Sequence, residues 1–178
     1  MENENKHVIL IGFKHVGKSA IGKELASRLH KPFVDLDQQI ETVFENLYHK
    51  KLACRQIMQR HGHIFFRELE RLCLKQTMDL HPSIISLGGG TPIEDENQIL
   101  LKQHTLIHIT APRGVVFERI MLQGRPAYFS KDEDPFLSFN HLWNEREKIY
   151  LKLTTLSVDN NNSIEFAVNA IIKKMTSN

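Results

Sequence analysis

Short apolar runs alternate along the chain with longer stretches in which apolar residues recur every three or four positions. The first run, residues 8–11, predicts a strand. The segment that follows places Ile21, Leu25 and Leu29 four positions apart, which predicts a helix from residue 18 to about residue 30. Strands that alternate with helices of this length are typical of a parallel sheet covered by helices on both faces.

The same alternation continues to the end of the chain. Further strands are predicted at residues 33–36, 83–87, 105–109 and 156–158, and further helices at residues 64–80, 114–121, 139–153 and 164–175. Residues 38–60 have a helical pattern in pieces, with no clear boundary between Asn46 and Lys51. Residues 159–163 supply a turn and a cap before the last helix. With no linker and no internal repeat, residues 1–178 are predicted to form one α/β domain.

A polar segment interrupts the pattern between residues 124 and 136. It carries five consecutive residues that disfavour packed structure, Lys131, Asp132, Glu133, Asp134 and Pro135. This composition is typical of a mobile loop.

Composition narrows the class of protein. Apolar residues make up 41% and charged residues 25% of the 178 residues, which is ordinary for a globular protein. No apolar run approaches the roughly 18 residues of a membrane span, and the first residues, MENENKH, lack the apolar segment of a secretory signal. The formal charge of +2 is spread along the chain. We therefore expect a cytoplasmic protein with no membrane or nucleic-acid partner.

Cysteine and histidine do not indicate a metal site. Cys54 and Cys73 are isolated, as buried or chemically idle thiols usually are. The spacings His61-x-His63 and His104-x3-His108 suit metal ligands, but neither pair comes with the third ligand that a closed site requires.

Residues 12–19 read Gly-Phe-Lys-His-Val-Gly-Lys-Ser, which fits the phosphate-binding pattern G-x-x-x-x-G-K-[ST]. A predicted strand before it and a predicted helix after it place bound phosphates at a helix N-terminus. Lys18 is expected to reach the β- and γ-phosphates, and the Ser19 hydroxyl to bind Mg²⁺. The candidate ATP-binding residues of this loop are Gly12, His15, Val16, Gly17, Lys18, Ser19 and Ala20.

Asp35 and Asp37 come at the end of the second predicted strand. Side chains two apart in a strand point the same way, so both carboxylates are expected at the ligand-binding edge of the sheet. One could orient water on Mg²⁺ while the other accepts a proton from a substrate hydroxyl. The plain structural alternative is a pair of acids that cap the following helix.

Four further motifs are weak individually. Arg67 and Glu70 are three apart on a predicted helix, where a surface ion pair is the plain alternative. Three glycines, residues 88–90, follow an apolar strand, so either another group approaches the backbone there or the glycines form a loose turn. Gly124-Arg125-Pro126 opens the polar loop, and Arg146-x3-Tyr150 lies in the helix beyond it.

Taken in order, these motifs resemble the shikimate kinase family over roughly residues 8–150. The resemblance implies a three-layer P-loop kinase fold, with a five-stranded parallel sheet flanked by helices and a mobile lid. It implies ATP-dependent phosphorylation of the 3-hydroxyl of shikimate, in aromatic amino-acid biosynthesis, with Mg²⁺ as cofactor. The substrate-binding region would span residues 38–70 and the lid residues 122–137, in a monomeric enzyme.

The resemblance also implies roles for individual residues. Arg67 and Arg146 would bind the shikimate carboxylate, as planar guanidinium groups suit it. Asp37 would hold the ring hydroxyls and activate the attacking one, while Asp35 would lie near Mg²⁺ without binding it directly. Residues Gly88, Gly89 and Gly90 would line the substrate, with Gly89 offering its backbone N–H.

Two more arginines receive roles from the resemblance. Lys18 and Asp37 would be joined in catalysis by Arg125, a lid arginine that closes on the transferring phosphoryl group and contacts ATP. Arg119 would lie against the adenine.

The chain departs from the family pattern at several positions. His15 stands where the family usually has a small residue, often glycine, and His63 where it usually has glutamate. The lid reads Arg-Pro-Ala-Tyr-Phe in place of Arg-Pro-Leu-Leu, and the stretch around residues 46–52 is longer than usual. Two alternatives therefore stay open. One is a kinase for another small polyol acid such as gluconate, and the other is a non-catalytic nucleotide-binding paralogue.

Overall fold

The computed structural model describes residues 6–126, 128–154, 156–161 and 163–176. Residues 127 and 162, which belong to the predicted lid and the predicted turn, lie outside the described residues, as do residues 1–5 and 177–178. The strands are β1 (Val8–Ile11), β2 (Phe33–Asp35), β3 (Ile84–Ser86), β4 (Thr105–Thr110) and β5 (Leu156–Asp159). The helices are α1 (Lys18–Leu29), α2 (Leu36–Tyr48), α3 (Cys54–His61), α4 (His63–Met78), α5 (Asp95–Leu101), α6 (Arg113–Met121), α7 (Pro135–Leu153) and α8 (Ile164–Thr176), with a 3₁₀ turn η1 (Thr91–Ile93).

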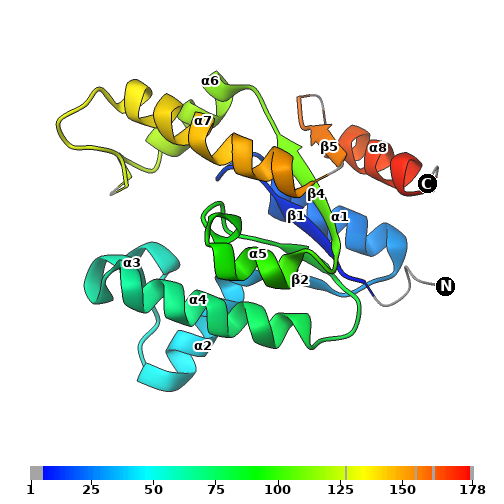
Figure 1. Ribbon diagram of the computed structural model, residues 1–178, viewed down its shortest axis with the longest axis horizontal. Coiled ribbons are helices and arrows are strands. Elements are labelled where there is room, and N and C mark those ends of the chain that lie inside the picture. Colours follow the sequence, from blue (N-terminus) through cyan, green and yellow to red (C-terminus); the bar gives the residue numbers. More distant parts are fainter. Residues whose placement is uncertain (1–5, 127, 155, 162, 177–178) are drawn as a thin grey trace.

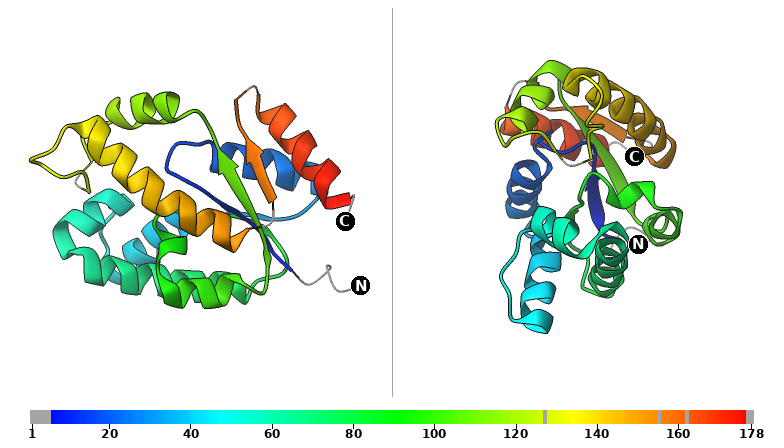
Figure 2. Two further views of the ribbon diagram at one scale, coloured as in Figure 1. Left: turned by 45° about the horizontal axis from the view of Figure 1, so that its top comes forward. Right: turned by 90° about the vertical axis from the view of Figure 1, so that its left-hand side faces the viewer.

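The five strands form one parallel sheet in the order β2-β3-β1-β4-β5. β1 is central, with Val8 paired to Ile84 of β3 on one side and to Thr105 of β4 on the other. Figure 2 shows the sheet between two sets of helices. The predicted three-layer α/β fold with a five-stranded parallel sheet is therefore confirmed.

Alternate residues of β1 enter two separate hydrophobic cores. Val8 and Leu10 pack with residues of α1, α6, α7 and α8, whereas Ile9 and Ile11 pack with residues of α2, α3, α4 and α5. All four side chains are buried. Because both faces of the strand are covered, its sequence is continuously apolar rather than alternating.

Residues 38–60, for which the sequence predicts no clear helix boundary, include parts of two helices, α2 and α3. α2 ends at Tyr48, and His49 follows in a left-handed conformation (φ 52°) whose N–H donates to the Glu45 carbonyl. This C-cap stops the helix without a glycine, so the sequence pattern hid it. α2, α3 and α4 lie together on one side of the molecule (Figure 1). The turn η1 and helix α5 were not predicted.

The segment between α6 and α7 is shorter than the span predicted for the lid. α7 begins at Pro135, so the loop after α6 covers residues 122–134 rather than 122–137. The Asp134 carboxylate accepts hydrogen bonds from the N–H groups of Phe136 and Leu137, and Pro135 occupies the first helical position. Asp-Pro is thus a helix start here, although its polar composition indicated a loop.

Candidate active site

The loop between β1 and α1 has the backbone shape that its glycines allow. Gly17 adopts φ 100°, and a Cβ placed on it would come within 2.3 Å of the Asn160 amide nitrogen. That amide donates to the Val16 carbonyl at 2.9 Å and so fixes the loop from the end of β5. A side chain at Gly17 would be strained and would displace this contact.

Lys18 is buried within the loop. Its Nζ donates to the carbonyls of Gly12 and Phe13, at 2.9 and 2.7 Å. Burial lowers the pKa of Lys18 to about 8, although the nearby Asp37 and Asp35 carboxylates act in the opposite direction. The ammonium group is therefore held ready for an anionic ligand, whose charge would restore the cationic form.

Ser19, Asp35 and Ser86 form a cluster of hard oxygen donors beside the loop. The Ser19 hydroxyl donates to Asp35 at 2.6 Å, and its oxygen lies 3.3 Å from that of Ser86. Mg²⁺ prefers one or two such protein oxygens together with phosphate oxygens and water. The residues present therefore fit Mg²⁺ bound with a nucleotide. Among the described residues, no group of three or more His, Cys, Asp or Glu side chains could hold a metal ion alone.

The two aspartates come together in a different way from the one predicted. Asp35 ends β2 and is the N-cap of α2, where its carboxylate accepts from the Asp37 N–H at 3.1 Å, and Asp37 lies in the first turn of the helix. The expectation that both project from a strand was wrong, because the chain turns into α2 directly after Asp35. Asp35 combines the capping alternative with a contact to Ser19.

Asp37 is poised to bind a proton near neutral pH. Burial, with a smaller contribution from the neighbouring Asp35 carboxylate, raises the pKa of Asp37 to about 6. A carboxylate with this pKa can accept a proton from a hydroxyl more readily than an ordinary aspartate.

The three glycines pack closely against other residues predicted to belong to the site. A Cβ on Gly88 would lie 2.8 Å from the Asp37 carboxylate, and one on Gly89 would lie 3.6 Å from the Arg146 guanidinium. A Cβ on Gly90 would lie 2.5 Å from the Arg67 guanidinium. Side chains therefore approach Gly88 and Gly90 closely, whereas at Gly89 the nearest atoms are the backbone nitrogen of Lys14 at 3.2 Å and the backbone oxygen of Gly12 at 3.4 Å. The triplet is packed against the rest of the site and is not a loose turn.

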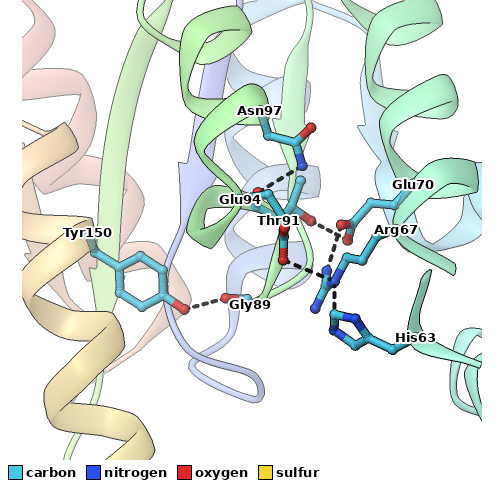
Figure 3. A network of polar contacts seen from close by, with 8 residues as sticks. All are labelled: His63, Arg67, Glu70, Gly89, Thr91, Glu94, Asn97 and Tyr150. Atoms are coloured by element: carbon cyan, nitrogen blue, oxygen red, sulfur yellow. Dashed lines mark hydrogen bonds and ion pairs between the residues drawn. The ribbon is translucent and has the colours of Figure 1, made fainter.

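Arg67 lies at the centre of a polar network (Figure 3). Its guanidinium pairs with Glu70 at 2.6 Å and with Glu94 at 3.4 Å, and its Nε donates to His63 Nε2 at 3.2 Å. Glu70 is buried and also accepts from the Thr91 hydroxyl at 2.8 Å. The predicted ion pair therefore exists, but it anchors Arg67 inside a site rather than on an open surface.

Arg146 and Tyr150 fix the other side of the triplet. The buried Tyr150 hydroxyl donates to the Gly89 carbonyl at 2.5 Å. The Arg146 guanidinium carbon lies 5.4 Å from the ring centre of Phe13 and 5.7 Å from that of Tyr128. The aromatic rings of Phe13 and Tyr128 hold the Arg146 cation in place without neutralising its charge.

A cavity of about 550 Å³ brings most of the predicted residues together. Its walls include the predicted residues His15, Gly17, Lys18, Ser19, Ala20, Asp35, Asp37, Arg67, Gly88, Gly89, Gly90 and Arg146. The residues predicted to bind ATP and those predicted to bind the acceptor therefore line one and the same cavity; below, the two sets are called the phosphate half and the acceptor half.

Four predicted residues do not line this cavity. Gly12 and Val16 contribute backbone to the loop, and the Val16 side chain is buried in the core. Arg119 donates to the His15 carbonyl at 3.0 Å. Arg125 is exposed and donates to the carbonyls of Ser130 and Glu133 within the lid.

Comparison with known proteins identifies the family. Residues 14–176 match the family model of shikimate kinase. The shikimate kinase of Syntrophus aciditrophicus is 32% identical over 136 residues, which cover 73% of this chain and 67% of that protein. The chain belongs to the shikimate kinase family. The shikimate kinase of Brucella canis is 31% identical over 148 residues, or 82% of this chain and 70% of that protein.

Solved structures of other proteins share the fold. The shikimate kinase of Aquifex aeolicus superposes with a TM-score of 0.76 at 27% identity, covering 96% of each chain. That of Acinetobacter baumannii, solved in complex with shikimate, gives a TM-score of 0.84 at 20% identity, covering 97% of this chain and 93% of the other. A gluconokinase of Sinorhizobium meliloti shares the fold only, with a TM-score of 0.54 at 12% identity.

The departures from the family pattern have structural consequences. His15 adopts φ 66°, a left-handed conformation that histidine tolerates better than most residues with a Cβ. Burial, reinforced by Lys14, lowers the pKa of its imidazole. His63 accepts a hydrogen bond from Arg67, a contact that a glutamate could also make.

Several residues that line the cavity were not predicted from the sequence. Residues not singled out as site residues include Lys14, Cys54, Arg55, Met58, Gln59, Phe66, Ser86, Leu87 and Tyr128. Ser86, the last residue of β3, could have been found from its place beside the glycine triplet. Cys54, taken for an idle thiol, lines the cavity and donates from its Sγ to the Asp37 carbonyl at 3.3 Å. Burial raises its pKa, so the thiol stays protonated.

Proposed function

We propose that this protein transfers the γ-phosphoryl group of ATP to the 3-hydroxyl of shikimate, giving shikimate 3-phosphate and ADP. The observation that carries the proposal is that Lys18 and Ser19 line the same cavity as Asp37, Arg67 and Arg146. Family membership supports ATP as the phosphoryl donor.

Each residue is assigned a step by its position. The loop N–H groups and Lys18 hold the β- and γ-phosphates, and Arg67 and Arg146 orient the acceptor through its carboxylate. Asp37 accepts the proton of the attacking hydroxyl, whose oxygen bonds to the γ-phosphorus as the bond from that phosphorus to the β,γ-bridging oxygen breaks. The leaving group is ADP.

Mg²⁺ would be held by Ser19, with Asp35 accepting hydrogen bonds from its water, and it would neutralise charge on the phosphates. Arg119 near the adenine and Arg125 on the phosphoryl group belong to the same proposal. Arg125 would have to leave its two lid carbonyls to reach the cavity.

Other features of the sequence stay predictions. They are the single-domain organisation, the monomeric state, the cytoplasmic location and the lack of a nucleic-acid partner. None of the described helices is long and apolar enough to cross a membrane.

The test is an assay of ADP release with ATP and Mg²⁺, comparing shikimate, gluconate and no acceptor. Turnover that depends on shikimate is expected. Turnover only with gluconate would overturn the acceptor, and ATP binding without any turnover would favour the non-catalytic paralogue.

A second measurement addresses the acceptor site directly. Arg67→Ala should weaken shikimate binding roughly 10- to 100-fold and leave ATP binding nearly unchanged, as measured by calorimetry, because it removes one charge-assisted contact. Arg71→Ala is the matched control, since Arg71 lies on the same helix and pairs with Glu96 outside the cavity. Equal loss of both ligands in Arg67→Ala would indicate a folding defect rather than the assigned role.

A further inference from the structure

Arg55 joins two parts of the molecule that are far apart in the sequence. It is exposed on the first turn of α3, within the predicted substrate-binding region. Its two terminal nitrogens donate to the carbonyls of Gln123 and Arg125, both at 3.1 Å. These carbonyls belong to the first residues of the lid, which approaches α3 in both views (Figures 1 and 2).

The contact is one that only an arginine makes well. A guanidinium presents several N–H donors in a rigid plane, so it can bridge two carbonyls two residues apart. A lysine would reach one of them at a time. The acceptors are neutral backbone groups, and no carboxylate among the described residues forms an ion pair with Arg55.

The bridge lies on the wall of the cavity. Arg55, Gln123 and Gly124 all line it, together with the acceptor-side residues Asp37 and Arg67. Because both hydrogen bonds are solvent-accessible, they can break and reform as ligands enter and leave.

We propose that Arg55 is a positioning residue that fastens the lid to the acceptor-binding helices, so that the cavity excludes water while the phosphoryl group is transferred. Without the bridge, the lid would open more often and water would compete with the acceptor for the phosphoryl group. The kinetic part of this inference rests on the proposed function, whereas the structural part does not.

The first test measures hydrogen exchange of the lid in the ligand-free protein. The N–H groups of Gln123, Gly124 and Phe129 donate to backbone carbonyls, so their exchange reports opening of the lid. In Arg55→Ala we expect exchange of a peptide spanning residues 122–130 to rise at least threefold, with Arg55→Lys intermediate. Arg60 is exposed on the same helix, and its side chain makes no hydrogen bond or ion pair with the described residues, so Arg60→Ala should leave this exchange unchanged.

Strand β1 serves as the internal control for folding. Unchanged lid exchange in Arg55→Ala would overturn the proposal. A rise that included residues 8–11 would overturn it too, because Arg55 would then stabilise the whole fold rather than the lid.

The second test is kinetic. Arg55→Ala should raise the ratio of ADP release without acceptor to ADP release with shikimate at least threefold, and should raise the KM for shikimate more than it lowers kcat. Arg55→Lys should recover part of the KM, and Arg60→Ala should match the wild type. If the wild type did not use shikimate, the proposed function would fail while lid exchange still decided the role of Arg55. A changed lid exchange with an unchanged ratio would overturn the water-exclusion role.

Discussion

In the phosphate half of the cavity, residues 12–20 supply the loop and the start of α1 from one continuous stretch of chain. In the acceptor half, Asp37, Arg67 and Arg146 come from three helices, α2, α4 and α7, and meet around the glycine triplet. The first half is set by local backbone geometry and the second by tertiary packing. Mutations in the two halves should therefore separate donor effects from acceptor effects.

The largest effect is expected in the acceptor half, at Asp37. Asp37→Asn keeps the shape of the side chain but removes the proton acceptor, so kcat should fall roughly 10²- to 10⁴-fold. ATP binding, which depends on the other half, should change little. The measurements are ADP release for turnover and calorimetry for ATP. Unchanged turnover would remove Asp37 from its assigned role.

The pH profile sharpens this assignment. In the proposed mechanism Asp37 acts in its deprotonated form, so with a pKa of about 6 the kcat/KM for shikimate should fall as the pH drops through 6. Lys18 acts in its protonated form, so with a pKa of about 8 the kcat/KM for ATP should fall as the pH rises through 8. An acid limb near pH 6 in the shikimate profile would support Asp37 as the titrating group of the acceptor half. An alkaline limb near pH 8 in the ATP profile would support Lys18 as that of the phosphate half. A profile flat from pH 5 to 9 would contradict both assignments.

The next largest effect belongs to the phosphate half. Lys18→Met keeps an apolar stem of similar length in the buried site but removes the ammonium group that we propose holds the phosphates. We expect kcat to fall roughly 10²- to 10³-fold, together with weaker ATP binding, because one preorganised charge is lost. Shikimate binding in the absence of ATP should be retained when measured by calorimetry. Loss of shikimate binding would show that the two halves are not separable.

The phosphate half could be predicted from the sequence more fully than the acceptor half. The loop at residues 12–19 was predicted with its strand and helix, because its function depends on backbone conformation and residues adjacent in the chain. Asp37 lines the cavity, but the strand geometry expected for it was wrong, since the turn into α2 depends on capping by Asp35. Arg55 and Tyr128 gave no local signal. They reach the cavity because α3 and the lid approach each other, and spacing in the sequence does not contain that contact.

A smaller effect is expected at the glycine triplet. Gly90 has φ −90° and ψ −20°, a conformation that alanine adopts without strain, so Gly90→Ala tests space alone. Its Cβ would lie 2.5 Å from the Arg67 guanidinium and would push it aside. We expect the KM for shikimate to rise roughly 10- to 100-fold with little change in the KM for ATP. The matched control is Gly114→Ala, because a Cβ there meets nothing within 4 Å. Similar kinetics for the two variants would argue against Arg67 as a carboxylate partner.

The smallest effect is expected back in the phosphate half, at His15. Its left-handed φ of 66° suits glycine, so His15→Gly should relieve strain and stabilise the fold by up to about 1 kcal/mol. This corresponds to a rise in Tm of about 2–4 °C for a chain of this length.

His49→Gly is the matched control, because His49 has φ 52° and is exposed outside the cavity. Its Tm should rise by a similar amount with no change in the KM for ATP. Since both variants release the same kind of backbone strain, any excess change in the KM for ATP of His15→Gly measures the imidazole itself. We expect that excess to stay within about threefold, because burial lowers the pKa of the His15 imidazole and so disfavours the charged form that would attract phosphate.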